Sequence, residues 1–330
     1  MAAFCRDLPE MEIRGNTRVF GIMGHPVQHS LSPLLHNMAF QETGYAGVYI
    51  PLDVKETGPF LKRTMQSLNL GGLSVTIPHK IWAHRMADRS DKLSQICGAS
   101  NTLLFLEKKG ETVIEARNSD GPGAIQALKQ ATTIRGKTVL ICGYGGSARA
   151  IAAQLLISEK PSRIWITGRN KTRIRAFIRD LKKQFPGAAI LALENNASSL
   201  PRPDVSSGKS IRNNSIQAKR QKSDEGMRYP DIIIQTTPLG MKTRSKSVTK
   251  DLPLNPELIQ RGCTVFDIVY SPMITPLIAL AKKKGCKVVY GYSMLLYQAV
   301  FQFRWFTGKE PPVSKWEKLL KKDLKSKSSG

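Results

Sequence analysis

Short apolar runs alternate along this chain with longer segments in which apolar residues recur every three or four positions. The short runs predict strands and the longer segments predict helices. The expected strands cover residues 17–23, 47–54, 73–77, 99–108, 112–118, 138–142, 163–170, 188–192, 230–241, 263–272 and 287–292. The expected helices cover residues 32–43, 58–72, 81–87 and 121–129, then segments near 146–156 and 171–182, and finally 275–284 and 293–307. Strands that alternate with helices indicate an α/β fold with a mainly parallel sheet.

The length of 330 residues favours two domains, and a second α/β unit begins near Asp120. Between residues 195 and 228 the sequence is polar and offers few side chains for a core. This segment predicts a long, partly disordered loop.

The chain carries a formal charge of +25, which is unevenly distributed. Its first 100 residues are nearly balanced, and the excess of Lys and Arg lies later, in the stretches KKQF, KRQK, KTRSK and AKKKGCK and in the tail from Lys315. Such a surface could attract nucleic acid, membranes or anionic substrates. No aromatic RNA-binding motif or paired Cys/His spacing accompanies the charge. We therefore expect no specific nucleic-acid partner and no metal site.

No apolar run approaches the roughly 20 residues of a membrane span. The first residues contain acids and no apolar stretch, so they do not resemble a signal peptide. The five cysteines are scattered, odd in number and free of metal-ligand spacing. Together these features predict a cytoplasmic protein with reduced thiols and no membrane partner.

The stretch GGLSVTIPHK, residues 71–80, is the first candidate for chemistry. Its apolar alternation predicts a strand that Pro78 ends, which leaves Lys80 at the strand tip. Most such lysines are solvated surface charges. A carboxylate beside Lys80 would hold its ammonium in place, and Asp120 is the candidate, although helix capping is the ordinary use of such a residue.

A second candidate is GYGGSARA, in which Gly143, Gly145 and Gly146 follow an apolar strand and open a helix. That order favours a dinucleotide pyrophosphate at the helix N-terminus over a tight turn without a ligand. After the next strand, Arg169 and Arg173 occur where an acid would select NAD. Guanidinium groups there favour the 2′-phosphate of NADP, and a solvated basic helix is the alternative.

Further polar residues lie where strands meet helices or turns. Ser30 and Ser32 flank a helix start, where they could receive a carboxylate, although Ser32 could equally be an N-cap. Ser74 and Thr76 share one face of their strand, and Asn101 lies beside turn residues that face a cleft.

From Thr17 to Gly308 the chain resembles the NADP-dependent shikimate dehydrogenase family. The resemblance rests on stretches that occur in family order: HSLSPLLHN, LSVTIPHK, GASNTL, NSDGPG, GYGGSARA, TTPLGM, DIVYSP and GYSMLLYQA. It implies a substrate-binding domain of residues 17–118 and 293–330, with a mainly parallel sheet, and a Rossmann NADP-binding domain of residues 119–292. The implied reaction is a reversible hydride transfer at the CH–OH group of shikimate, with NADP as cofactor and the small-molecule substrate as partner. A monomer or homodimer is expected.

The resemblance also implies residue roles. Lys80 and Asp120 would be the catalytic pair, with Lys80 the proton donor to the forming alkoxide. The implied substrate-binding residues are Ser30, Ser32, Ser74, Thr76, Asn101, Tyr270 and Gln298. The implied cofactor-binding residues are Gly143, Gly145, Gly146, Ser147, Arg169, Asn170, Arg173, Thr237, Ile268 and Gly291.

The chain departs from this family at several positions. Ser74 replaces a usual Asn, Gln235 replaces a common Asn, and Asn170 replaces a usual Thr beside Arg169. The segment 195–228 is longer than typical, and the basic tail is interpreted as lying outside the family pattern. Ser74 leaves open an alternative function as a quinate/shikimate dehydrogenase. A non-catalytic regulatory or nucleic-acid-binding relative is the alternative of another class, and the presence of both Lys80 and Asp120 argues against it.

Overall fold

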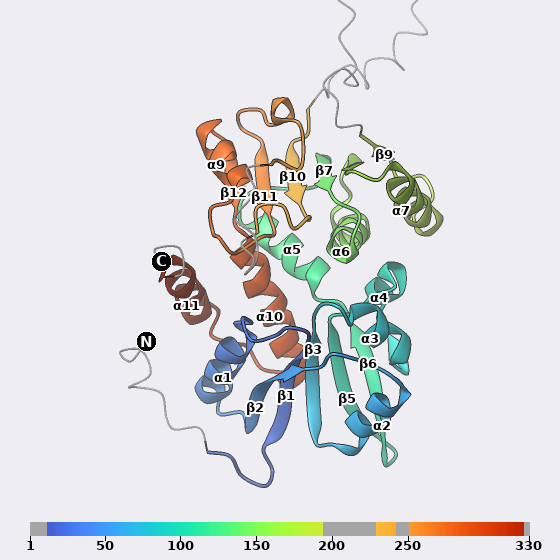
Figure 1. The fold of residues 1–330 in the computed structure, drawn as a ribbon, viewed down its shortest axis with the longest axis vertical. Coiled ribbons are helices and arrows are strands. Elements are labelled where there is room, and N and C mark those ends of the chain that lie inside the picture. The colour runs from blue at the N-terminus through green and yellow to red at the C-terminus, as the bar shows by residue number, and fades with distance from the viewer. Residues whose placement is uncertain (1–11, 194–228, 242–250, 327–330) are drawn as a thin grey trace, which may run out of the picture.

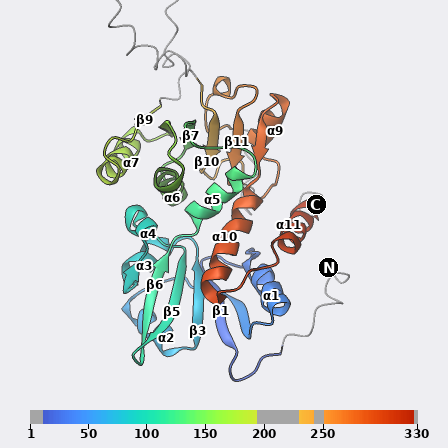
Figure 2. The same ribbon diagram turned by 180° about the vertical axis from the view of Figure 1, so that it is seen from behind.

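Two six-stranded sheets, one above the other, organise the chain (Figures 1 and 2). The computed structural model describes residues 12–193, 229–241 and 251–326. The predicted loop 195–228 lies outside the described residues. The first sheet has the order β2-β1-β3-β5-β6-β4 and the second the order β12-β11-β10-β7-β8-β9.

The first sheet contains parallel and antiparallel neighbours. Its strands are β1 (Arg18–Gly24), β2 (Gly47–Asp53), β3 (Leu70–Val75), β4 (Arg89–Ser90), β5 (Thr102–Lys108) and β6 (Glu111–Arg117). The pairs β1/β2, β1/β3 and β4/β6 are parallel, whereas β3/β5 and β5/β6 are antiparallel. A two-residue turn at Lys109–Gly110 joins β5 to β6 and accounts for their antiparallel pairing, because a tight turn can join only antiparallel strands.

Helices cover both faces of this sheet, because successive strand residues point to opposite sides. They are α1 (Ser32–Thr43), α2 (Pro59–Ser67) and α3 (Lys80–Met86). The next helix, α4 (Lys92–Cys97), buries Leu93 and Cys97 in the core of the second sheet instead. On β5, Leu104 packs into a core with residues of α1, whereas Leu103 packs on the other side with residues of α3 and β6. The strand is therefore apolar at consecutive positions, as a sheet buried on both faces requires.

All strand pairs in the second sheet are parallel. Its strands are β7 (Thr138–Cys142), β8 (Arg163–Thr167), β9 (Ile190–Ala192), β10 (Ile232–Gln235), β11 (Thr264–Asp267) and β12 (Lys287–Val289). The helical segments are α5 (Asp120–Lys129), α6 (Gly146–Gln154), η1 (Leu155–Glu159), α7 (Lys171–Gln184), η3 (Pro256–Leu258) and α9 (Pro276–Lys283). Val139 and Ile141 of β7 face one core and Leu140 and Cys142 the other.

The two sheets are joined where α5 crosses α10 (Gly291–Thr307). A Cβ on Gly123 would lie 2.7 Å from the backbone nitrogen of Gln298, so only glycine allows the two helices to approach this closely. The predicted domain boundaries fall just before α5 and within the first turn of α10. Helix α10 starts beside the second sheet and packs through Leu296, Val300 and Phe303 into the core of the first.

Helix α11 (Val313–Ser326) was not predicted, since the last expected helix ended at residue 307. Its Trp316 and Leu320 are buried against α1 and α10. The tail contains many lysines, but its few apolar residues recur at helical spacing and form one buried stripe.

The predicted helix 58–72 is also too long. Helix α2 ends at Ser67, and Leu70 to Gly72 belong to β3. Gly71 and Gly72 lie against the rings of Phe20 and Phe306, so they allow aromatic packing on the strand rather than end a helix.

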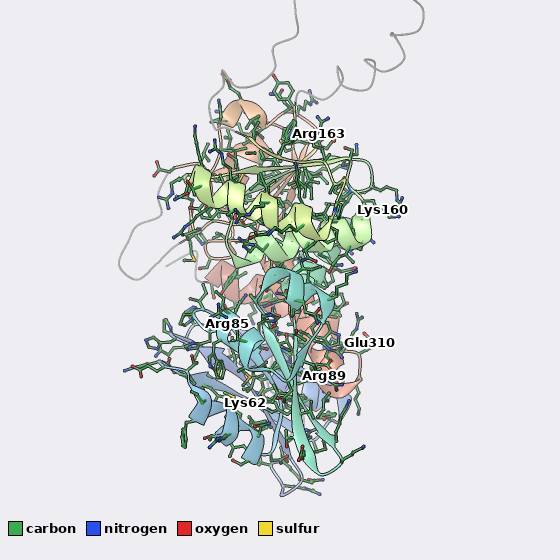
Figure 3. All side chains as sticks on the ribbon, turned by 90° about the vertical axis from the view of Figure 1, so that its right-hand side faces the viewer. Lys62, Arg85, Arg89, Lys160, Arg163 and Glu310 are labelled. Atoms are coloured by element: carbon green, nitrogen blue, oxygen red, sulfur yellow. The ribbon has the colours of Figure 1, made fainter. Side chains whose placement is uncertain are left out.

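Basic side chains project from the surface around both sheets (Figure 3). Lys62, Arg85 and Arg89 lie around the first sheet, and Lys160 and Arg163 lie around the second. Some of them form ion pairs, as Lys62 does with Asp88. Within the described residues, no helix is long and apolar enough to cross a membrane.

Candidate active site

The stretch 71–80 forms the end of β3 and the start of α3, with Lys80 as the first residue of that helix. The Lys80 ammonium donates a hydrogen bond to Asp120 Oδ2 at 2.6 Å. The Lys80 side chain is 24% exposed and the Asp120 side chain 5%. The structure therefore brings the two residues together, with the cation partly accessible and the carboxylate buried.

Asp120 does not cap α5, which was the ordinary alternative for this residue. The side-chain oxygen of Asn118 instead accepts hydrogen bonds from the backbone N–H groups of Asp120 and Gly121. Both Asp120 carboxylate oxygens thus remain available for side chains. One accepts from Lys80, and the other accepts from Asn101 Nδ2 at 2.8 Å.

Asn101 holds this carboxylate in place. Its amide nitrogen also lies 3.2 Å from Gln298 Oε1 on α10. Its oxygen accepts from the backbone N–H of Ser119 at 2.7 Å. Asn101 is 2% exposed, so these bonds fix its orientation in a buried setting.

A second polar network lies beside this pair and contains two residues that the sequence did not indicate, Tyr49 and Gln302. The Tyr49 hydroxyl donates to Ser74 Oγ at 2.6 Å, and Ser74 donates to Gln302 Oε1 at 2.8 Å. Ser32 is a further hydrogen-bond partner of the Tyr49 hydroxyl. Burial raises the pKa of Tyr49, so its hydroxyl keeps its proton and acts as a donor. One signal was available for Gln302, since it lies four positions after Gln298 and shares its helix face.

Ser32 is not the N-cap of α1. Leu31 is the N-cap and makes no side-chain cap bond, while Ser32 is the first helical residue. Ser30 Oγ accepts from the backbone N–H of Ser32 at 3.3 Å. Thr76 lies half-buried just beyond β3, where its backbone N–H bonds to the oxygen of Met23.

The glycine turn after β7 has the backbone that a dinucleotide site requires. Gly143 has φ +124°, and a Cβ there would collide with Thr236. Gly145 and Gly146 have open space where a Cβ would lie. Gly145 is the N-cap of α6 and provides no side-chain cap, and Ser147 follows in the first turn. The N–H groups of that turn are therefore suited to an anion.

Arg169, Asn170 and Arg173 are exposed at the end of β8 and the start of α7. The Asn170 side chain accepts from the backbone N–H of Arg173 at 2.9 Å, so it caps α7. This fixes the Arg173 backbone beside Arg169. Both arginines are exposed to solvent, and they follow β8, the strand next to β7 in the second sheet.

The remaining cofactor candidates lie in turns after neighbouring strands. Gln235 is fully buried at the end of β10 and bonds to the backbone of Thr237 through both side-chain atoms, so it shapes that turn. A Cβ on Gly291 would overlap the backbone oxygens of Ile268 and Val269. Gly291 therefore lets α10 begin directly against the turn after β11.

Asp267, at the end of β11, is a structural residue that the sequence did not single out. Its carboxylate accepts from the backbone N–H of Val269 at 3.0 Å and from the Thr275 hydroxyl at 2.6 Å. Burial raises its pKa to about 6, against the opposing effect of these hydrogen bonds. The turn that it stabilises also carries Tyr270, which is largely buried, and burial raises the pKa of that phenol.

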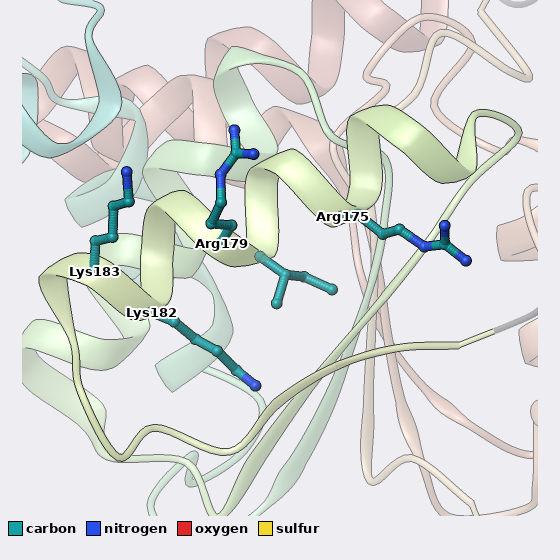
Figure 4. A pocket seen from close by; sticks show the side chains of 5 residues that line it. Arg175, Arg179, Lys182 and Lys183 are labelled. Carbon is teal, nitrogen blue, oxygen red and sulfur yellow. The ribbon is translucent and has the colours of Figure 1, made fainter.

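A surface hollow lies along α7, the helix whose first turn carries Arg173. It is lined by Arg175, Ile178, Arg179, Lys182 and Lys183, whose basic groups spread outward along the helix (Figure 4). Within the described residues it is an open, basic surface, with Arg179 close to the carboxylate of Asp180. It contains none of the predicted site residues.

Comparison with known proteins gives the family. Residues 22–103 match the shikimate dehydrogenase substrate binding domain, and residues 291–321 match the shikimate 5′-dehydrogenase C-terminal domain. The interpretation of the basic tail as lying outside the family pattern is therefore wrong up to residue 321. The NADP(+) shikimate dehydrogenase of Methanobrevibacter smithii is 36% identical over 315 residues, which are 94% of this chain and 99% of that protein.

Two solved structures have the same fold. Shikimate 5-dehydrogenase of Listeria monocytogenes, in complex with shikimate and NAD, has a TM-score of 0.76 at 26% identity and covers 94% of this chain and 99% of its own. The Thermus thermophilus enzyme, in complex with NADP(H) and shikimate, has a TM-score of 0.69 at 26% identity and covers 92% and 99%. The chain belongs to the shikimate dehydrogenase family.

Proposed function

We propose that this protein catalyses the reversible NADPH-dependent reduction of 3-dehydroshikimate to shikimate. The contact between Lys80 and Asp120 carries the proposal, since an ammonium held by a buried carboxylate and still partly exposed can exchange a proton with a bound substrate. Family membership supplies the substrate and the cofactor. The relatives named above bind or act on shikimate and use NADP or NAD.

In this mechanism Lys80 donates its proton to the oxygen of the forming alkoxide at C3. Asp120 holds the Lys80 ammonium in position, and Asn101 in turn fixes the second carboxylate oxygen of Asp120. In the oxidation direction Lys80 takes the hydroxyl proton. The pair thus supplies the proton transfer that must accompany hydride transfer.

The residues around the pair would bind the substrate. Ser30 and Ser32, near the start of α1, would receive the carboxylate, and Thr76, Asn101, Tyr270 and Gln298 would surround the ring hydroxyls. Ser74 has a different role in this proposal. Because its hydroxyl bonds to Tyr49 and Gln302, it supports the wall of the site from behind.

The residues present fit NADP. The open space at Gly145 and Gly146, together with Ser147, would accommodate the pyrophosphate at the start of α6. Arg169 and Arg173 would bind the 2′-phosphate, and Thr237, Ile268 and Gly291 would border the remainder. When bound, the cofactor supplies or accepts the hydride.

The test is a steady-state assay with shikimate or quinate as substrate and NADP⁺ or NAD⁺ as cofactor. We expect turnover with shikimate and NADP⁺, followed as absorbance of the reduced nicotinamide. Absence of turnover in all four combinations would refute the proposal. Turnover with quinate at a comparable kcat/KM would favour the quinate/shikimate alternative.

Replacement of Lys80 tests the proton transfer. Lys80→Ala should lower kcat about 10²–10⁴-fold, the usual contribution of a general acid, while shikimate still binds. Lys55→Ala removes an exposed lysine and is the matched control. Retained turnover in Lys80→Ala would show that another group transfers the proton.

Replacement of Arg169 tests the cofactor preference. Arg169→Gln should raise KM for NADP⁺ much more than KM for NAD⁺, because only NADP⁺ carries the 2′-phosphate. Arg175→Gln makes the same change of charge on α7, in the hollow beside that helix, and should leave both constants unchanged. Equal effects of Arg169→Gln on both cofactors would contradict the assigned role.

A further inference from the structure

Two cysteines that are far apart in the sequence meet at one edge of the second sheet. Cys263 Sγ and Cys286 Sγ are 3.4 Å apart. Both are free thiols, and the Cys286 sulfur also lies 3.2 Å from the backbone oxygen of Gln260. The pair lies outside the proposed catalytic machinery.

The strand register explains the proximity and meets the geometry of a disulfide. Each cysteine directly precedes its strand, and β11 pairs with β12 through Thr264 opposite Lys287. The Lys287 N–H donates to the Cys263 oxygen at 2.9 Å, which extends the ladder by one position. Neighbouring strands lie about 4.8 Å apart, within the range of Cα separations of about 4.4–6.8 Å that disulfides span.

The two thiols differ in accessibility. Cys263 is 6% exposed, whereas Cys286 is half-buried and reachable from solvent. Burial, reinforced by the neighbouring Cys286, raises the pKa of Cys263 to about 12. An incoming oxidant therefore meets Cys286 first, and Cys263 completes the bond.

We propose that Cys263 and Cys286 are a redox-active pair that forms a reversible intramolecular disulfide on reaction with a low-molecular-weight disulfide. The Cys286 thiolate attacks one sulfur of the oxidant, so a mixed disulfide forms and one small thiol leaves. The Cys263 sulfur then attacks Cys286 Sγ, the mixed disulfide breaks, and the Cys263 proton goes to the second departing thiolate. Two protein thiols are oxidised, and one small disulfide is reduced to two small thiols.

The location of Cys263 and Cys286 determines how a disulfide between them would affect stability and turnover. The bond would close the loop that contains Asp267, Tyr270 and α9, which restricts the unfolded chain. It would form at the amino ends of β11 and β12, whereas Ile268 and Gly291 follow the carboxyl ends of these strands. Oxidation should therefore raise the thermal unfolding midpoint by several degrees and leave kcat within about twofold.

The experiment treats the purified full-length protein with glutathione disulfide and then alkylates the remaining thiols. Trypsin cleaves after Arg261, Lys282, Lys284 and Lys287, so the bond joins the peptide 262–282 to the peptide 285–287. We expect this linked peptide, with a mass lower by two hydrogen atoms than the sum of its parts. A reductant should restore the separate peptides and the original unfolding midpoint.

The variants Cys286→Ser and Cys263→Ser should lose the linked peptide and the shift in midpoint. Cys97→Ser, which removes a buried thiol elsewhere, should retain both. Stable glutathionylation at Cys286 without the linked peptide, or no reaction at either thiol, would overturn the proposal. A linked peptide without any rise in the midpoint would overturn the stabilising role.

Discussion

Asp267→Asn should change how the stability of this protein depends on pH. Asp267 is buried at the end of β11, and its pKa is raised from 3.8 to about 6. The folded state therefore binds the proton more tightly than the unfolded state does. The stabilisation from this proton is complete below the unfolded pKa of 3.8 and is lost as the pH rises through about 6.

The size of the effect follows from the shift. A difference of about two pKa units corresponds to about 3 kcal/mol at most, at 1.36 kcal/mol per unit. Asn is neutral at every pH, so the free energy of unfolding of the variant does not fall as the pH rises through about 6. Its oxygen can accept from Val269 N–H, and its amide can donate to the Thr275 hydroxyl.

The assay is urea unfolding of both proteins, followed by tryptophan fluorescence in steps from about pH 4 to about pH 8. The free energy of unfolding of the variant minus that of the wild type should rise by up to about 3 kcal/mol across this range. Asp251→Asn is the control for the same change at an exposed aspartate. A difference that stays flat or falls with pH would refute the reasoning.

Three further predictions concern packing and the buried polar network. Trp316→Ala should lower the free energy of unfolding by about 3–5 kcal/mol, since the ring is fully buried between α11 and the first sheet's core; a loss under 1 kcal/mol would mean that α11 is not docked. Gly123→Ala should cost about 1–3 kcal/mol in urea unfolding, because its Cβ would press on the α10 backbone, whereas Gly15→Ala meets open space and is the control. Ser74→Ala should cost about 1–3 kcal/mol because it removes the buried hydrogen bonds of Ser74 with Tyr49 and Gln302, and a double-mutant cycle with Tyr49→Phe should show coupling rather than additivity.

The parts of the fold that could be predicted are those that local pattern determines. Short apolar runs predicted the described strands except β4, although several predicted strands extended too far, as 230–241 did for β10. The order of strand, glycines and helix predicted the turn that begins α6. The strand predicted over residues 73–77 exists, but β3 ends at Val75, two residues earlier than Pro78 indicated. Each of these features depends on neighbouring residues and on backbone chemistry.

The features that could not be predicted depend on contacts between distant segments. Ser74 meets Gln302 across 228 residues, and no local pattern indicates which polar residues will meet. Helix α11 was missed because its lysines dominate the composition, and the burial of Trp316 becomes evident only when α1 and α10 are in place. The cysteine pair has the same origin, since adjacent strands bring together residues that are scattered in the sequence.

The network around Ser74 connects this residue to the contact between Lys80 and Asp120. A serine there leaves room for the Tyr49 hydroxyl, which donates to Ser74 while Ser74 donates to Gln302. Gln302 also donates to the backbone oxygen of Asn101, and Asn101 orients Asp120, so Ser74 is connected to the proposed catalytic pair through Gln302 and Asn101. Its substitution should thus alter how firmly Asp120 is held, even though Ser74 bonds to neither member of the pair.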